Sequence, residues 1–166
     1  MPVVRMSYPK GALSQAQKQM LASEITDIVL DAEVDAVTAN GKSLTVVQFQ
    51  EAAVEDWAVG GVLGAAAGPG PKHFIVDVVV LQGLLEGERR SATHRRITTA
   101  FQHAFAGDPN ADPMLPMRVW VLVHELSEGS WGGAGTTVSA LDVADFINPA
   151  LDAARRSEIA AAIGRT

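Results

Sequence analysis

The sequence contains no cysteine, which excludes disulfides, thiolate nucleophiles and cysteine-ligated metal sites. It also has no unbroken apolar run of the roughly 18 to 20 residues that a membrane-spanning helix needs. Its first residues lack the basic and apolar regions of a signal peptide. We therefore expect a cytoplasmic protein that does not enter a membrane.

An excess of positive charge is absent as well, since the net charge is -6. Binding to a phosphate backbone needs a clustered excess of lysine and arginine, so we expect no nucleic-acid partner. Three arginine pairs stand out locally, at 89–90, 95–96 and 155–156. Each falls on a predicted helix, where we interpret it as part of a solvated face.

Signals for a metal or a bound phosphate are also missing. The glycine pairs at 60–61 and 132–133 follow an aromatic residue and lack the Lys-Ser/Thr ending of a phosphate-binding loop, so we interpret them as turns. No spacing among the four histidines brings two imidazoles and a carboxylate together on one helix. These histidines are His73, His94, His103 and His124. We expect no metal and no cofactor.

The first half of the chain has the pattern of a βαβ unit. A strand is predicted from Pro2 to about Tyr8, and a β-rich run covers residues 43–50. Between them, residues 14–17 form a capping box that begins a helix. One face of that helix is apolar. The face carries Leu21, Ile25, Ile28, Val29 and Ala32. The two strands of such a unit are parallel.

The second half repeats this pattern after a small-residue linker at 64–71. We predict a strand at 73–81, a helix from about 88 to 106 and a strand at 117–125. The inward face of this helix carries Ile97, Phe101, Ala104 and Phe105. In both halves a glutamate closes the second strand and a tryptophan follows six residues later. These pairs are Glu51 with Trp57, and Glu125 with Trp131. The 74 residues between the two glutamates indicate an internal duplication.

Together these patterns predict an α/β (α+β) domain over residues 1–166. It comprises a first βαβ repeat at about 2–62, a second at about 73–135 and an extension at 136–166. The tandem repeat gives a four-stranded sheet with two helices on one face. The strand at 73–81 is apolar at nearly every position, which fits burial on both faces. Because the tail at 151–163 is too short to cover the second face, we expect a homo-oligomer.

The start of the chain offers a catalytic group. If Met1 is removed, which a small second residue permits, Pro2 becomes a terminal secondary amine. An α-amino group has a pKa of roughly 7.7 to 8.0, and apolar burial lowers it further. Such an amine can move a proton next to a carbonyl near neutral pH. If Met1 is retained, the peptide nitrogen of Pro2 has no proton-accepting lone pair, and a non-catalytic role is favoured.

The proline, the tandem βαβ pattern and the acidic-x5-aromatic-Gly ending together resemble the tautomerase superfamily. Its members include 4-oxalocrotonate tautomerase, malonate semialdehyde decarboxylase and cis-3-chloroacrylic acid dehalogenase. The chain is most similar to the dehalogenase-like group, from Pro2 to about Gly135. The matching stretches are 25–27, 49–51, 60–62, 120–121 and Glu125. The resemblance implies a tautomerase/MIF-like fold, a homotrimer, a small-molecule substrate and Pro2 as acid or base.

The sequence also departs from this group. Apolar or amide residues align with its catalytic histidine, its two arginines and its tyrosine, and a glycine aligns with its water-activating glutamate. In that order the positions are Val29, Leu81 with Leu84 (or Gln82 with Leu85), Leu122 and Gly133. Hydration of a carbon–carbon double bond, as in a dehalogenase or hydratase of three-carbon unsaturated acids, needs those groups. Tautomerisation of a small 2-keto or enol acid needs fewer. A trimeric binding or scaffold protein without catalysis is the alternative.

Without those arginines, another cation is needed for a substrate carboxylate. We assign this role first to Lys10, at the end of the first strand, with Arg5 and Arg118 as alternatives.

Three further side chains are candidates. Trp57 and Trp131 align with an aromatic residue that lines the pocket of the short tautomerases, although packing at a subunit interface explains them equally well. Gln48 can donate to a developing enolate oxygen or serve as a satisfied polar group of the sheet.

Overall fold

The protein is built on a four-stranded sheet in the order β2-β1-β5-β6. The computed structural model describes residues 2–67, 70–109 and 111–164. The sheet strands are β1 (Val3–Pro9), β2 (Val46–Ala52), β5 (Phe74–Leu81) and β6 (Val119–Leu126). β1 pairs in parallel with β2 and β5 in parallel with β6, whereas the central pair, β1 and β5, is antiparallel. The predicted tandem βαβ architecture is confirmed.

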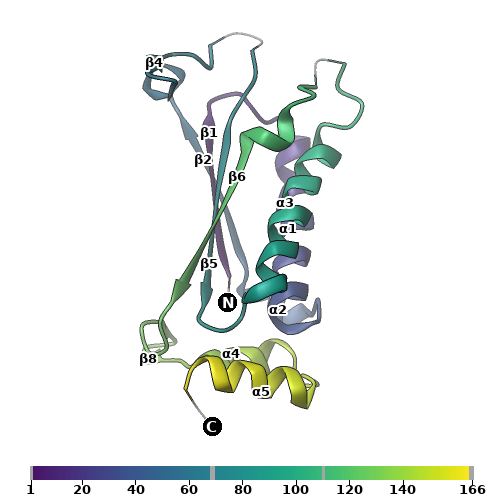
Figure 1. Ribbon diagram of the computed structural model, residues 1–166, viewed down its shortest axis with the longest axis vertical. Coiled ribbons are helices and arrows are strands. Elements are labelled where there is room, and N and C mark those ends of the chain that lie inside the picture. Colours follow the sequence, from purple (N-terminus) through teal and green to yellow (C-terminus); the bar gives the residue numbers. More distant parts are fainter. Residues whose placement is uncertain (1, 68–69, 110, 165–166) are drawn as a thin grey trace.

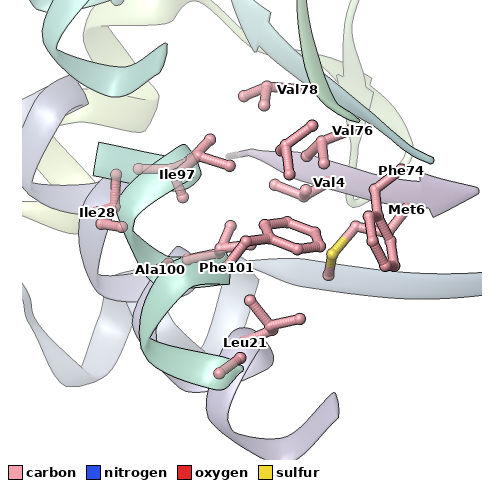
Figure 2. Packing of buried hydrophobic residues seen from close by; sticks show 14 of the residues in the cluster. Val4, Met6, Leu21, Ile28, Phe74, Val76, Val78, Ile97, Ala100 and Phe101 are labelled. Carbon is pink, nitrogen blue, oxygen red and sulfur yellow. The ribbon is translucent and has the colours of Figure 1, made fainter. Parts of the chain in front are cut away.

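Both long helices cover the same face of the sheet, as predicted (Figure 1). They are α1 (Gln15–Val34) and α3 (Gly87–Ala104). The hydroxyl of Ser14 and the side chain of Gln17 form the expected capping box at the start of α1. The core between sheet and helices includes Val4, Met6, Leu21, Phe74, Val76, Ile97 and Phe101 (Figure 2).

Contacts between the halves repeat with the duplication. The Lys18–Glu51 ion pair (2.8 Å) has its counterpart in Arg90–Glu125 (2.8 Å). Gln17 donates to the backbone oxygen of Ala104 (3.2 Å), and 72 residues after Gln17 the guanidinium of Arg89 donates to that of Ala32 (3.2 Å). The two βαβ units are therefore related by a pseudo-twofold axis between β1 and β5.

Two predicted strands begin later than the sequence pattern indicated. Residues 43–44 belong to α2 (Ala39–Leu44), which starts because the hydroxyl of Thr38 accepts from the backbone N–H of Gly41 (3.0 Å). Residues 117–118 belong to a 3₁₀ turn, η2 (Leu115–Arg118), and Arg118 pairs with Asp112 there. Side-chain caps therefore extend the turns at the expense of the strands.

Short hairpins follow the second strand of each half. The first contains a 3₁₀ turn, η1 (Val54–Asp56), and strands β3 (Ala58–Val59) and β4 (Val62–Leu63). The second consists of β7 (Gly132–Gly133) and β8 (Thr136–Thr137). These hairpins lie at opposite ends of the sheet (Figure 1).

The C-terminal extension forms two short helices, α4 (Ala140–Ile147) and α5 (Ala153–Ala162). They lie across the end of the sheet at which β5 finishes, and not on its second face (Figure 1). There they build a second apolar cluster with the end of α1 and of β5. It includes Leu30, Val34, Leu81, Leu84, Ala144, Ile147 and Ile159. Among the described helices, none combines the length and apolar character needed to cross a membrane.

The second face of the sheet has no helix over it among the described residues (Figure 1). Large apolar side chains of the edge strands are exposed there, with Val46 51%, Trp120 56% and Leu122 46% exposed. Polar groups cross its middle, where the ring of His124 contacts the carboxylate of Asp77 (2.7 Å).

The contact between α5 and the turn after β5 can be tested at one glycine. A Cβ at Gly83 would lie 2.7 Å from the Cβ of Ala162, whereas one at Gly107 would meet nothing within 4 Å. Both glycines have φ of 84° and share the same backbone strain. We expect Gly83→Ala to lower the free energy of unfolding in urea by about 1 to 3 kcal/mol more than Gly107→Ala. Equal losses would contradict this packing.

Candidate functional site

Pro2 lies at the end of the sheet where β1 begins and where β5 and β6 finish. Its side chain is buried, and its backbone oxygen accepts from the N–H of Val46 (3.2 Å). Val3 pairs with Val79 across the central ladder, so Pro2 is level with Val80. We name the surroundings of Pro2, including the ends of α1 and β5, the proline end of the sheet.

The last turns of α1 bring a carboxylate to the proline end. Val29 and Glu33, four residues apart on one helix face, are both fully buried. Burial raises the pKa of the Glu33 carboxyl, while the positive charges of the amino terminus and of Arg155 act in the opposite direction. Glu33 and the amino terminus are therefore electrostatically coupled.

A buried arginine fixes α5 to this region. The Arg155 side chain is 5% exposed. Its guanidinium donates to the backbone oxygen of Glu33 (2.9 Å) and to that of Leu84 (2.7 Å), and it pairs with Glu158 (3.0 Å). A cation at the C-terminal carbonyls of α1 also complements the helix dipole.

A second cation lies near the proline end and is also engaged. Arg90 on α3 pairs with Glu125 (2.8 Å), which is level with Val80, and donates to the backbone oxygen of Leu85 (3.1 Å). The hydrogen bonds and ion pairs of Arg90 and Arg155 therefore hold protein groups in the single chain.

An apolar cavity of about 480 Å³ opens beside the β7–β8 hairpin and α4. Leu44 lines it, two residues before the strand residue that bonds to Pro2. The other apolar or aromatic side chains in its wall are Trp131, Ala134, Val138, Val143 and Phe146. Trp131 also packs against the second apolar cluster. The structure therefore places Trp131 at the proline end, although Pro2 does not line this cavity.

Other predicted site residues lie at the far end of the sheet. Lys10 follows β1, whose seven residues span about 23 Å at 3.3 Å each. Trp57 follows β2 and Arg118 precedes β6, which places both at the end of Lys10. Gln48 is exposed on the second face of the sheet, next to Arg5. One chain therefore does not bring these residues to Pro2.

At that far end Arg118 is already engaged. Its guanidinium pairs with Asp112 (2.5 Å) and approaches the ring of His73 (3.3 Å). Burial, and then the charge of Arg118, lower the pKa of His73 below its usual value.

The sequence matches no family model and, at the level of significance applied, no curated protein. Solved structures do match. A member of the cis-3-chloroacrylic acid dehalogenase (cis-CaaD) family named N1 is 16% identical with a TM-score of 0.65, covering 96% of this chain and 99% of its own. A fused 4-OT symmetric trimer, Q0, is 20% identical with a TM-score of 0.61, covering 84% and 96%. The chain has the tautomerase-superfamily fold.

A third neighbour, Pt0534 inactivated by 2-oxo-3-pentynoate, gives the same result at 20% identity and a TM-score of 0.61, covering 83% of this chain and 96% of its own. The resemblance inferred from the sequence is therefore confirmed for the fold. It includes the tandem βαβ architecture and the similarity to the cis-CaaD group.

Within this tautomerase fold, most of the positions that depart from the dehalogenase-like pattern are structural. Val29, Leu81 and Leu84 are buried in the apolar clusters. The amide of Gln82 donates to the backbone oxygen of Ala162 (2.8 Å) and so ties the turn after β5 to α5. These positions are occupied by packing and hydrogen bonding inside the chain.

Sequence reasoning missed Glu33 and Arg155. The helical pattern contained a signal for Glu33, because it lies eight residues after Ile25 and four after Val29 on the apolar face. Arg155 was interpreted as part of a solvated face. This was wrong, because only Arg156 of that pair is substantially exposed, at 52% against 5% for Arg155.

The same arginine pair provides a matched test. Arg155→Met removes hydrogen bonds to two buried carbonyls, so we expect the free energy of unfolding to fall by about 2 to 4 kcal/mol. Arg156→Met breaks only an exposed pair with Asp145 and should cost less than about 1 kcal/mol. Urea unfolding followed by circular dichroism measures both. Similar losses in the two variants would show that Arg155 does not anchor α5.

Proposed function

We propose that the chain is a cofactor-independent tautomerase in which the amine of Pro2 is the general acid and base, acting on a small 2-keto or enol acid. The observation that carries the proposal is the place of Pro2 in this fold. It is buried at the start of β1, among apolar residues and within the electrostatic reach of a carboxylate. The proposal requires that Met1 is removed.

The chemistry follows from this environment. A neutral amine takes a proton from the carbon next to the carbonyl, and the resulting ammonium returns a proton at the other end of the enolate. Apolar surroundings favour the neutral amine and a nearby carboxylate favours the charged one, which keeps both forms accessible. No redox step or hydration is involved, so the groups missing at Leu122 and Gly133 are not needed.

We assign substrate binding to Lys10, Gln48, Trp57 and Arg118 of a neighbouring subunit, together with Trp131. The first four lie away from Pro2 in their own chain. A cyclic trimer joins different surfaces of identical subunits, so it can bring such residues to the proline end of the next chain. The fused 4-OT neighbours include symmetric and asymmetric trimers.

A trimeric binding or scaffold protein without catalysis is the second candidate. It is favoured by the fact that Pro2 does not line the apolar cavity and that Arg90 and Arg155 are engaged with protein groups.

The homotrimer can be tested on the second face of the sheet. Leu122 on that face and Met20 on the outer side of α1 are equally exposed, at 46% each. We expect Leu122→Lys to convert the trimer to monomer, because it places a charge in the buried interface. Met20→Lys should leave the trimer intact. Size-exclusion chromatography with light scattering reports the mass. A trimeric Leu122→Lys protein would place the interface elsewhere.

The role of Pro2 is tested by ketonisation of phenylenolpyruvate. The samples are tag-free wild type and Pro2→Ala, each with its N-terminus confirmed by intact mass. Loss of a positioned acid–base group should lower kcat/KM by about a hundredfold or more. A wild-type sample that retains Met1 should be equally inactive. Equal, near-background rates for wild type and Pro2→Ala, with the amine shown to be free, would refute the tautomerase proposal and favour the binding protein.

A further inference from the structure

We infer that the carboxylate of Glu33 faces the amine of Pro2 and stabilises its protonated form, which makes Glu33 the positioning residue of the acid–base group. The inference rests on the proposed function for its catalytic meaning. Its structural content, a charge contact between the two groups, can be tested without any activity.

The internal duplication supplies the first argument. Val4, Met6 and Tyr8 of β1 point to the helices, as do Val76, Val78 and Val80 of β5, 72 residues later. The same offset relates Gln17 to Arg89 and Ala32 to Ala104 in their matching contacts.

This offset carries Pro2 onto Phe74 and Glu33 onto Phe105. Phe74 and Phe105 are in contact, with ring centroids 5.9 Å apart. Because the two halves pack alike, Glu33 should lie against Pro2 as Phe105 lies against Phe74.

Burial supplies the second argument. Glu33 is fully buried, and an ionised carboxylate in such a place needs a positive partner. The hydrogen bonds of Arg155 described above go to the backbone oxygens of Glu33 and Leu84 and to Glu158. The positive amino terminus acts on the Glu33 pKa more strongly than Arg155 does. The amine is therefore the better-placed partner for this carboxylate.

The pair gives Pro2 two accessible states. In one, the ammonium of Pro2 faces the Glu33 carboxylate; in the other, the proton has moved from the amine to the carboxylate and both groups are neutral. The total charge is the same in both states, so a buried site can hold either. The neutral amine accepts the substrate proton, and the ammonium donates one back.

The direct test is a pH titration of the Pro2 nitrogen. Tag-free protein labelled with ¹⁵N-proline, with its free N-terminus confirmed by mass, is followed by nitrogen NMR in wild type and Glu33→Gln. Removal of an opposite charge at contact distance should lower the midpoint by about one pH unit or more. Glu51→Gln is the control, because Glu51 is the exposed end-of-strand glutamate at the far end of the sheet. It should leave the midpoint unchanged.

An unchanged midpoint in folded Glu33→Gln would overturn the inference, as would an equal shift in Glu51→Gln. Circular dichroism establishes that each variant is folded. If Glu33→Gln does not fold, Glu33→Asp takes its place, because its shorter arm moves the carboxylate away from the amine. It should shift the midpoint in the same direction by a smaller amount, and an unchanged midpoint would refute the contact.

The pH profile of phenylenolpyruvate ketonisation separates the two proposals. If Pro2 catalyses the reaction, the acidic limb of kcat/KM should move to lower pH in Glu33→Gln by the shift seen in the titration. A shifted titration in a protein without activity would refute the tautomerase and retain the Glu33 contact. Activity that requires Pro2, with identical limbs and midpoints in wild type and Glu33→Gln, would refute the contact and retain the tautomerase.

Discussion

The antiparallel ladder between β1 and β5 is the constraint on which the rest of the molecule depends. Each βαβ unit has its own parallel ladder, but only this pairing joins the two units into one sheet. Because both crossovers have the same hand, it also places α1 and α3 on one face and leaves the other face uncovered. The start of β1 is thereby brought beside the ends of β5 and β6. Pro2 is buried there for reasons of topology before any chemistry is considered.

The two ends of the sheet have diverged within this symmetric frame. At one end Phe74, Phe101 and Phe105 form an aromatic cluster. The other end has Glu33 on α1 and is closed by α4 and α5. The C-terminal extension has no counterpart after the first repeat, so it covers one end alone. Burial of a carboxylate is therefore a property of the proline end and not of the repeat.

Most of the fold could be predicted from the sequence, because alternating and helical periodicities report on faces that are buried within the chain. The start of β2 was misjudged because one side-chain cap, at Thr38, decides it. The site was less predictable. The burial of Arg155 depends on carbonyls more than 70 residues away. The distance from Pro2 to Lys10 depends on the direction of a strand, and the division of the chain at 136–166 stays a prediction.

The ion pairs between the two long helices have one further consequence. Glu24 of α1 contacts His103 of α3, and Arg96 of α3 contacts Asp31 of α1. The pseudo-symmetric positions thus carry opposite signs: acids on α1, and an arginine and a histidine on α3. If two first repeats from different chains paired, acid would face acid; if two second repeats paired, Arg96 would face His103. The charge pattern therefore favours pairing of unlike halves and disfavours exchange between chains during assembly, an effect that added salt should weaken.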